Sequence, residues 1–98
     1  MMKVTTIGVA WYRPEDWAAL KSMFVDSDKL QENYQDWLHD AEELEKDLSE
    51  AGHLVKRVHL DPKTFPGWCT LRGLRPDAAA RSQFASEFVR LNPDKGNV

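Results

Sequence analysis

The sequence predicts a small single α+β domain in the order β-α-α-β-α-α, in which helices cover a two-stranded, parallel sheet. Two short segments, 3–12 and 53–60, are rich in the β-branched and apolar residues that favour strands. The regions between and after them carry apolar residues at helical spacing. The 98 residues include one cysteine, so no internal disulfide can form and packing must stabilise the fold.

The first strand is predicted over 3–12, with apolar residues on both of its faces. Small residues at Gly8 and Ala10 would allow a helix to approach the strand backbone closely. The second strand is predicted over 53–60. Two strands joined by a helical crossover are most simply parallel neighbours.

Two helices are predicted between the strands. Pro14 favours the start of a short helix over 14–24, since the first helical position tolerates its missing N–H. The second helix is predicted over 28–51, capped by side-chain oxygens in 26–28 and ended by Gly52. Its apolar stripe consists of Leu30, Tyr34, Trp37, Ala41, Leu44, Leu48 and Ala51. This heptad-like stripe also fits pairing with another helix, in the same chain or in a second copy.

The segment 64–72 fits either a short helix or a third strand, and we favour the helix. Thr64 would cap it and Gly73 followed by Leu74 would stop it. A last helix is predicted to begin at Pro76 and Asp77 and to end before Pro93, with an inward stripe of Ala80, Phe84, Phe88 and Leu91. Residues 1–93 would then form one domain, and residues 94–98 a frayed tail.

The net charge is −3, and it is unevenly distributed. Residues 28–51 hold nine acidic residues against two basic ones, a balance that repels nucleic acid. Residues 53–98 hold eight basic residues against four acidic ones and could attract an anion. The longest run without a charge, 4–12, is shorter than the roughly 20 residues of a membrane-spanning helix, and no signal peptide is evident. We therefore expect a cytoplasmic location and no membrane partner.

Parallel strands bring their C-terminal ends to one edge of a sheet, where ligands often bind. The candidate ligand-binding residues at that edge are Trp11, Arg13, His59, Asp61, Trp68, Cys69 and Arg72. Aromatic walls with one or two arginines would suit a small anionic or planar ligand. The alternative is that the aromatic residues seal the end of the core and the arginines pair with the acidic helix.

Enzymatic chemistry has little support in the sequence. Cys69 with His59 and Asp61 is a weak thiol-nucleophile pattern, because cysteine is more often a buried core residue. His53 and His59 are too far apart along one strand to share a zinc ion. No phosphate-binding glycine loop or zinc-ligand spacing is present. We predict no catalytic residue, no metal site and no cofactor.

A two-stranded sheet is marginally stable alone, and an exposed strand edge can pair with a second copy. The leading prediction is therefore a non-catalytic homodimeric module that binds protein, with its sheet extended by dimerisation. The first alternative is a protein or enzyme that binds a small anionic ligand at the strand ends. The second is nucleic-acid binding through the C-terminal helical hairpin, with Arg75 and Arg81 on phosphates, although the acidic segment argues against it.

Overall fold

The computed structural model describes residues 5–92 and confirms the predicted element order and the parallel sheet. Strand β1 (Thr6–Trp11) pairs with β2 (Leu54–His59), and Trp11 lies opposite His59 at the C-terminal ends. The first two residues of the predicted strand 3–12 lie outside the described residues, as does the tail 94–98 that was expected to fray.

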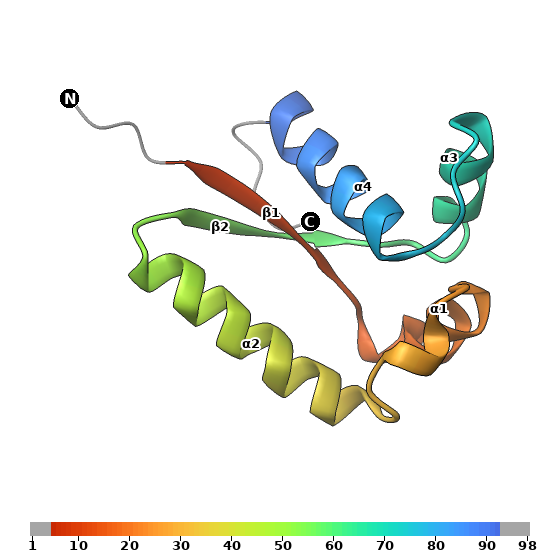
Figure 1. Ribbon diagram of the computed structural model, residues 1–98, viewed down its shortest axis with the longest axis horizontal. Coiled ribbons are helices and arrows are strands. Elements are labelled where there is room, and N and C mark those ends of the chain that lie inside the picture. Colours follow the sequence, from red (N-terminus) through yellow and green to blue (C-terminus); the bar gives the residue numbers. More distant parts are fainter. Residues whose placement is uncertain (1–4, 93–98) are drawn as a thin grey trace.

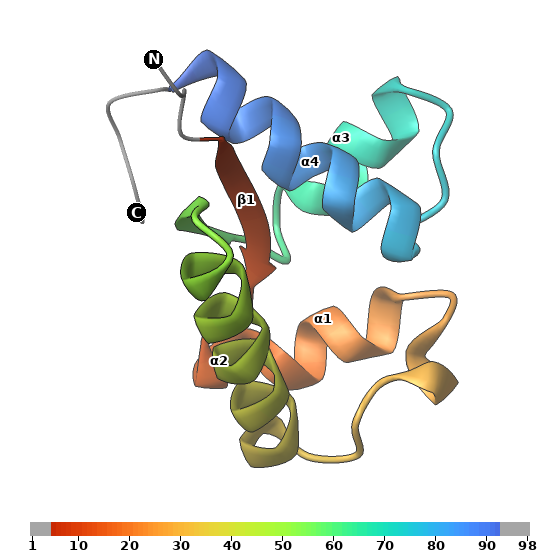
Figure 2. The ribbon, with the colours of Figure 1, turned by 60° about the vertical axis from the view of Figure 1, so that its left-hand side comes forward.

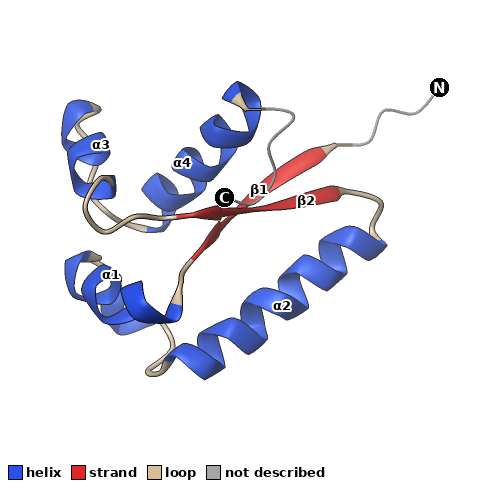
Figure 3. Cartoon of the chain, turned by 180° about the vertical axis from the view of Figure 1, so that it is seen from behind, coloured by secondary structure: helices blue, strands red, loops and turns tan. Residues whose placement is uncertain are grey.

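Helices cover both faces of the sheet (Figure 1). Helix α2 (Tyr34–Glu50) lies on one face and α4 (Ala78–Leu91) on the other. Beyond the C-terminal ends of the strands, α1 (Trp17–Met23) lies on the α2 side and α3 (Phe65–Leu71) on the α4 side (Figure 3). Among residues 5–92, no helix combines the length and apolar character needed to span a bilayer.

The acidic helix α2 begins six residues later than predicted. Ser27–Lys29 forms a separate 3-10 turn, and the side-chain oxygen of Asn33 then caps α2 by accepting the backbone N–H of Asp36 at 2.9 Å. Leu30 therefore lies in the connecting loop and packs against the core from there. The prediction of a helix over 28–51 is wrong at its start because Asn33, and not residues 26–28, supplies the cap.

The predicted glycine helix ends are confirmed. Gly52 has φ 97°, and the N–H of His53 donates to the carbonyl of Leu48 at 3.1 Å. Gly73 has φ 65°, and the N–H of Leu74 donates to the carbonyl of Cys69 at 2.9 Å. Both helices thus end in a left-handed residue that places an otherwise unsatisfied carbonyl in a hydrogen bond.

The segment 64–72 is helical, as favoured. Two details differ from the prediction, the cap expected from Thr64 and the burial expected for Leu91, whereas Asp77 starts the last helix as predicted. Thr64 precedes α3 with near-helical dihedrals, φ −108° and ψ −29°, and its side chain makes no capping bond. Asp77 does cap α4, accepting the N–H of Ala80 at 3.0 Å. Leu91, expected on the inward stripe, is 68% exposed, and the buried residues of α4 are Ala80, Arg81 and Ala85.

The backbone of α4 packs directly on β1 at Gly8. A Cβ built on Gly8 would lie 2.5 Å from the carbonyl oxygen of Ala85 and 3.0 Å from Cγ1 of Val89. A contact that short is not tolerated, so only glycine permits this approach. The close helix approach expected at Gly8 is confirmed.

Replacing Gly8 with alanine is expected to lower the free energy of unfolding by about 1 to 3 kcal/mol, because the Ala85 backbone would have to move. Urea unfolding followed by circular dichroism measures the change. Gly67→Ala is the matched control, since its new Cβ meets nothing within 4 Å and alanine favours the helix α3. A Gly8→Ala variant as stable as the parent chain would contradict the close packing of α4 on β1.

Candidate functional site

The C-terminal ends of the strands are filled by a cluster of aromatic side chains. Trp37 of α2 lies at its centre, with ring centroids 5.3 Å from Trp11 and 4.5 Å from Tyr12. Tyr12 continues the cluster to Phe24 at 5.7 Å, and Phe24 contacts Phe65 at 6.1 Å. Burial raises the pKa of Tyr12 to about 12, so its hydroxyl stays protonated at neutral pH. The end of the core is therefore closed by aromatic packing.

The seven candidate ligand-binding residues fall on different parts of this end. Trp11 lies opposite His59 and contacts Trp37 of α2. Trp68 carries the Arg72 guanidinium 4.7 Å above its ring and contacts Phe84 of α4. Since α2 and α4 lie on opposite faces of the sheet, these two pairs face different sides.

The remaining three candidate residues are Arg13, Asp61 and Cys69. Arg13 and Asp61 are exposed, and the Asp61 carboxylate accepts the backbone N–H of Lys63 at 2.8 Å. Cys69 is 2% exposed, and burial raises the pKa of its thiol. A nucleophilic cysteine requires the opposite shift, toward the thiolate. The structure brings Trp11 near His59 and Trp68 near Arg72, and the ligand cleft itself stays a prediction.

Three arginines are held between an aromatic ring and a carboxylate, an arrangement that the sequence did not reveal. Arg57 bonds Glu45 at 2.7 and 2.8 Å and lies 4.0 Å above Trp11. Arg72 bonds Glu87 at 2.9 Å, beside its contact with Trp68. Of the candidate-site arginines that were expected to pair with the acidic helix, Arg72 pairs instead with Glu87 of α4. Glu45 of α2 is paired with Arg57, a strand residue outside that candidate set.

The third of these pairs, between Arg81 and Asp26, is the most buried. Two hydrogen bonds of 2.9 and 3.1 Å join the guanidinium to the carboxylate, and the guanidinium lies 4.4 Å above Phe24. The side chain of Arg81 is 9% exposed, and these hydrogen bonds hold the pKa of Asp26 below its usual value. Of the two arginines named for nucleic acid, Arg75 is exposed and Arg81 is held in this internal pair.

The edge of β1 that faces away from β2 is open. The carbonyls of Thr5 and Trp11 accept the N–H groups of Leu54 and Leu60 at 2.9 and 3.0 Å, so the odd-numbered residues of β1 face β2. Backbone polar groups alternate in direction along a strand, and Gly8 and Ala10 therefore direct theirs to the other edge. Within residues 5–92, the sheet has only two strands, so no third strand pairs there.

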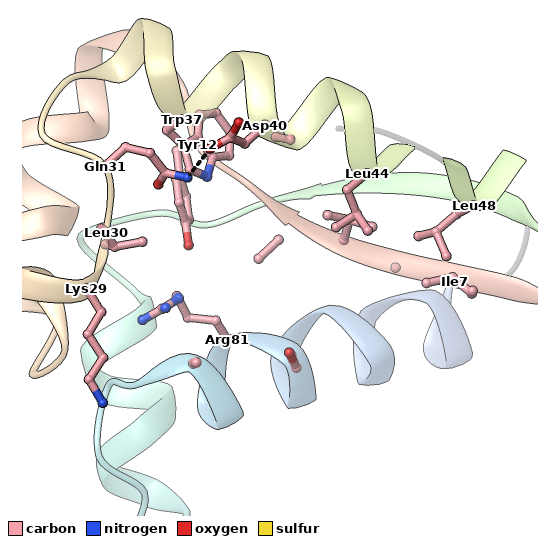
Figure 4. Close-up of a pocket in the computed structure, with 16 residues that line it drawn as sticks. Ile7, Tyr12, Lys29, Leu30, Gln31, Trp37, Asp40, Leu44, Leu48 and Arg81 are labelled. Atoms are coloured by element: carbon pink, nitrogen blue, oxygen red, sulfur yellow. Dashed lines mark hydrogen bonds between the residues drawn. The ribbon is translucent and has the colours of Figure 1, made fainter. Parts of the chain in front are cut away.

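A groove of about 500 Å³ runs along this open edge (Figure 4). Its floor is residues 7–10 of β1, and α2 and α4 form its two walls, which lie on either side of β1 in Figure 2. Leu44 and Leu48 point into it from α2, and Arg81 points into it from α4. A second hollow of about 290 Å³, which shares Ile7 and Gly8, continues the groove toward the start of β1.

The groove explains why the apolar stripe of α2 is only partly buried. Trp37 and Ala41 are 7% exposed, as the stripe predicted, whereas Leu44 is 47% exposed and Leu48 is half-buried. Ala51 is exposed. The stripe therefore continues from the aromatic core into the groove, and it leaves apolar side chains beside backbone groups that no other strand of residues 5–92 pairs with.

A metal ion needs several ligating side chains grouped around it. Within residues 5–92, no three histidine, cysteine, aspartate or glutamate side chains are grouped as metal ligands would be. His39 lies 4.0 Å from Glu43, and both side chains are largely exposed to solvent. The groove is thus the most distinct candidate site on the described part of the chain.

A family model described as a domain of unknown function (DUF8829) matches residues 2–94. No curated protein and no solved structure matches the chain.

Proposed function

We propose that the chain, which belongs to the family of domains of unknown function DUF8829, is a non-catalytic module that binds protein by strand addition. In this mode an extended polypeptide segment would join the open edge of β1 as a third strand. The observation that carries the proposal is the groove, in which the edge of β1, unpaired within residues 5–92, lies between two helical walls. Leu44 on the α2 wall is 47% exposed.

The position of the groove supports an added strand. A strand placed beside β1 would lie about 4.8 Å from it. It would exchange hydrogen bonds with the backbone N–H and carbonyl groups of Gly8 and Ala10. Its two faces would then be covered by α2 and α4, which form the walls. A third strand also strengthens a sheet that is marginal with two. Backbone bonding and apolar burial would thus act together.

A second copy of the chain fits this edge less well than a segment without helices. Helix α4 packs directly on β1 through Gly8, so an antiparallel pairing of two β1 edges would place both α4 helices on one face of the joined sheet, each over its own β1 strand. Packed helices require about 8 to 10 Å between their axes, about twice the roughly 4.8 Å that separates neighbouring strands. Sedimentation velocity at micromolar concentrations tests for the homodimer predicted from the sequence.

Panning a random twelve-residue peptide display library against the chain tests the proposal. A selected peptide is expected to shift the backbone amide resonances of Gly8 and Ala10. It should also bind the Leu44→Glu variant about tenfold more weakly, since a carboxylate would enter the apolar wall. Leu71→Glu is the matched control, because Leu71 is 89% exposed and lies on α3.

Two results would count against strand addition. One is a selected peptide that shifts amides elsewhere and ignores Leu44→Glu. The other is a concentration-dependent dimer that Leu44→Glu abolishes, which would place a second copy in the groove. Circular dichroism spectra of both variants would show that the fold is retained, as expected for changes at side chains already 47% and 89% exposed.

A further inference from the structure

We infer that the segment bound in this groove is basic, with lysine or arginine side chains directed toward α2; this inference rests on the proposed strand addition. The first observation is an acidic stripe on α2, made of Asp36, Asp40, Glu43 and Asp47. These residues recur every three or four positions, so they lie on one side of the helix. All of them are exposed.

The acidic stripe borders the apolar wall of the groove. Asp40 lines the groove itself, where its carboxylate accepts a hydrogen bond from the Gln31 amide at 2.7 Å (Figure 4). Asp40 and Asp47 stand one helical turn before and after Leu44, so both flank the leucine that points into the groove. A segment that contacts Leu44 therefore passes beneath these carboxylates.

Within residues 5–92, the lysine and arginine side chains that line the groove do not pair with this rim, whose Glu43 lies 4.0 Å from His39 on the same helix. The Arg81 guanidinium is already bonded to Asp26 at 2.9 Å. Lys29 lies at one end of the groove, and its amino group points toward the start of α4 and away from α2. On the opposite side of α2, Glu45 is paired with Arg57 at 2.7 Å. The four exposed carboxylates of the acidic stripe thus lie along the α2 rim of the groove.

The two walls would select different side chains of an added strand. Successive side chains of a strand point to opposite faces, so alternate residues would face α2 and α4. Toward α2, a lysine or arginine could lay its aliphatic part on Leu44 and Leu48 while its charge reaches the acidic rim. Toward α4, the lining residues Ala78 and Ser82 are small and the helix lies close to the sheet. The pattern expected is basic or apolar residues alternating with small ones.

The amino-acid sequences of the peptides selected in the panning experiment also test this inference. Peptides selected by the parent chain are expected to carry a net positive charge in the alternating pattern. The double variant Asp40→Asn with Asp47→Asn should bind a selected peptide about three- to tenfold more weakly at low salt, and the difference should shrink at high salt. The matched control is Glu15→Gln with Glu42→Gln. It also removes two negative charges, but these lie near Tyr34, outside the acidic stripe.

The outcomes separate this inference from the proposal on which it rests. Neutral or acidic peptides that shift Gly8 and Ala10 but bind the double variant normally would overturn the basic partner and leave strand addition standing. Equal weakening by the two double variants would also overturn it, because only the overall charge would then matter. Failure to select any peptide that contacts β1 would overturn both.

Discussion

Replacing Arg81 with methionine is expected to lower the free energy of unfolding by about 3 to 5 kcal/mol, the range for removing one partner of a buried ion pair. Arg81 and Asp26 have side chains that are 9% and 17% exposed, and they are joined by hydrogen bonds of 2.9 and 3.1 Å. Methionine keeps most of the aliphatic volume over Phe24 but leaves the Asp26 carboxylate without its guanidinium. Urea unfolding measures the loss.

Arg72→Met is the matched control, since Arg72 makes the same kind of pair with Glu87 at a position that is 42% exposed. An exposed pair contributes about 0 to 1 kcal/mol, so this variant should remain close to the parent chain. Similar losses in the two variants would contradict the buried role of Arg81. Such a result would favour the alternative prediction that Arg81 contacts the phosphates of a nucleic acid.

The same pair makes stability depend on pH. Hydrogen bonds from Arg81 lower the pKa of Asp26 below its usual value of 3.8, so the folded chain binds fewer protons at this site than the unfolded chain. The contribution of the pair is therefore fully present above the usual pKa and is lost as the pH falls through the lower folded value. In Arg81→Met, the loss of stability on acidification should be smaller than in the parent chain. Urea unfolding at several pH values from about 2.5 to about 6 measures this difference.

Local chemistry made most of the fold predictable from the sequence. Gly52 and Gly73 mark helix ends because glycine alone adopts positive φ without strain, and both have it. The small residue Gly8 predicted a close helix approach, which α4 makes. The parallel sheet followed from two short strands separated by a helical crossover. The two helix ends depend only on neighbouring residues, whereas the sheet and the close approach at Gly8 join segments that are distant in the sequence but carry their own local signals, a strand pattern and a small side chain.

The features that the sequence did not reveal depend on tertiary contacts. Asp26 and Arg81 are 55 residues apart, and nothing in their local sequence identifies them as partners. Asn33, which lies beyond the residues 26–28 expected to cap α2, supplies the cap, and Leu30 packs against the core from the loop before it. The groove could not be located because the same apolar stripe predicts burial of Leu44 and Leu48 whether or not another element covers them.

Replacing Trp37 with alanine is expected to lower the free energy of unfolding by about 3 to 5 kcal/mol, the range for truncating a buried aromatic residue. Trp37 is 7% exposed, and its ring lies within 6 Å of four others, those of Trp11, Tyr12, Trp17 and Tyr34. Removing the indole ring would therefore break aromatic contacts with β1, with the residue after it, with α1 and within α2. Because tryptophan fluorescence changes with the substitution, circular dichroism should follow the unfolding.

Trp37→Phe separates loss of packing from loss of the indole itself. Phenylalanine keeps an aromatic ring among the same neighbours, so its effect should be well below that of alanine. If Trp37→Ala instead unfolded like the parent chain, the aromatic cluster would not be the closed end of a core. That result would favour the predicted ligand cleft at the C-terminal edge of the sheet, because aromatic side chains that do not stabilise the fold there would be available to a planar ligand.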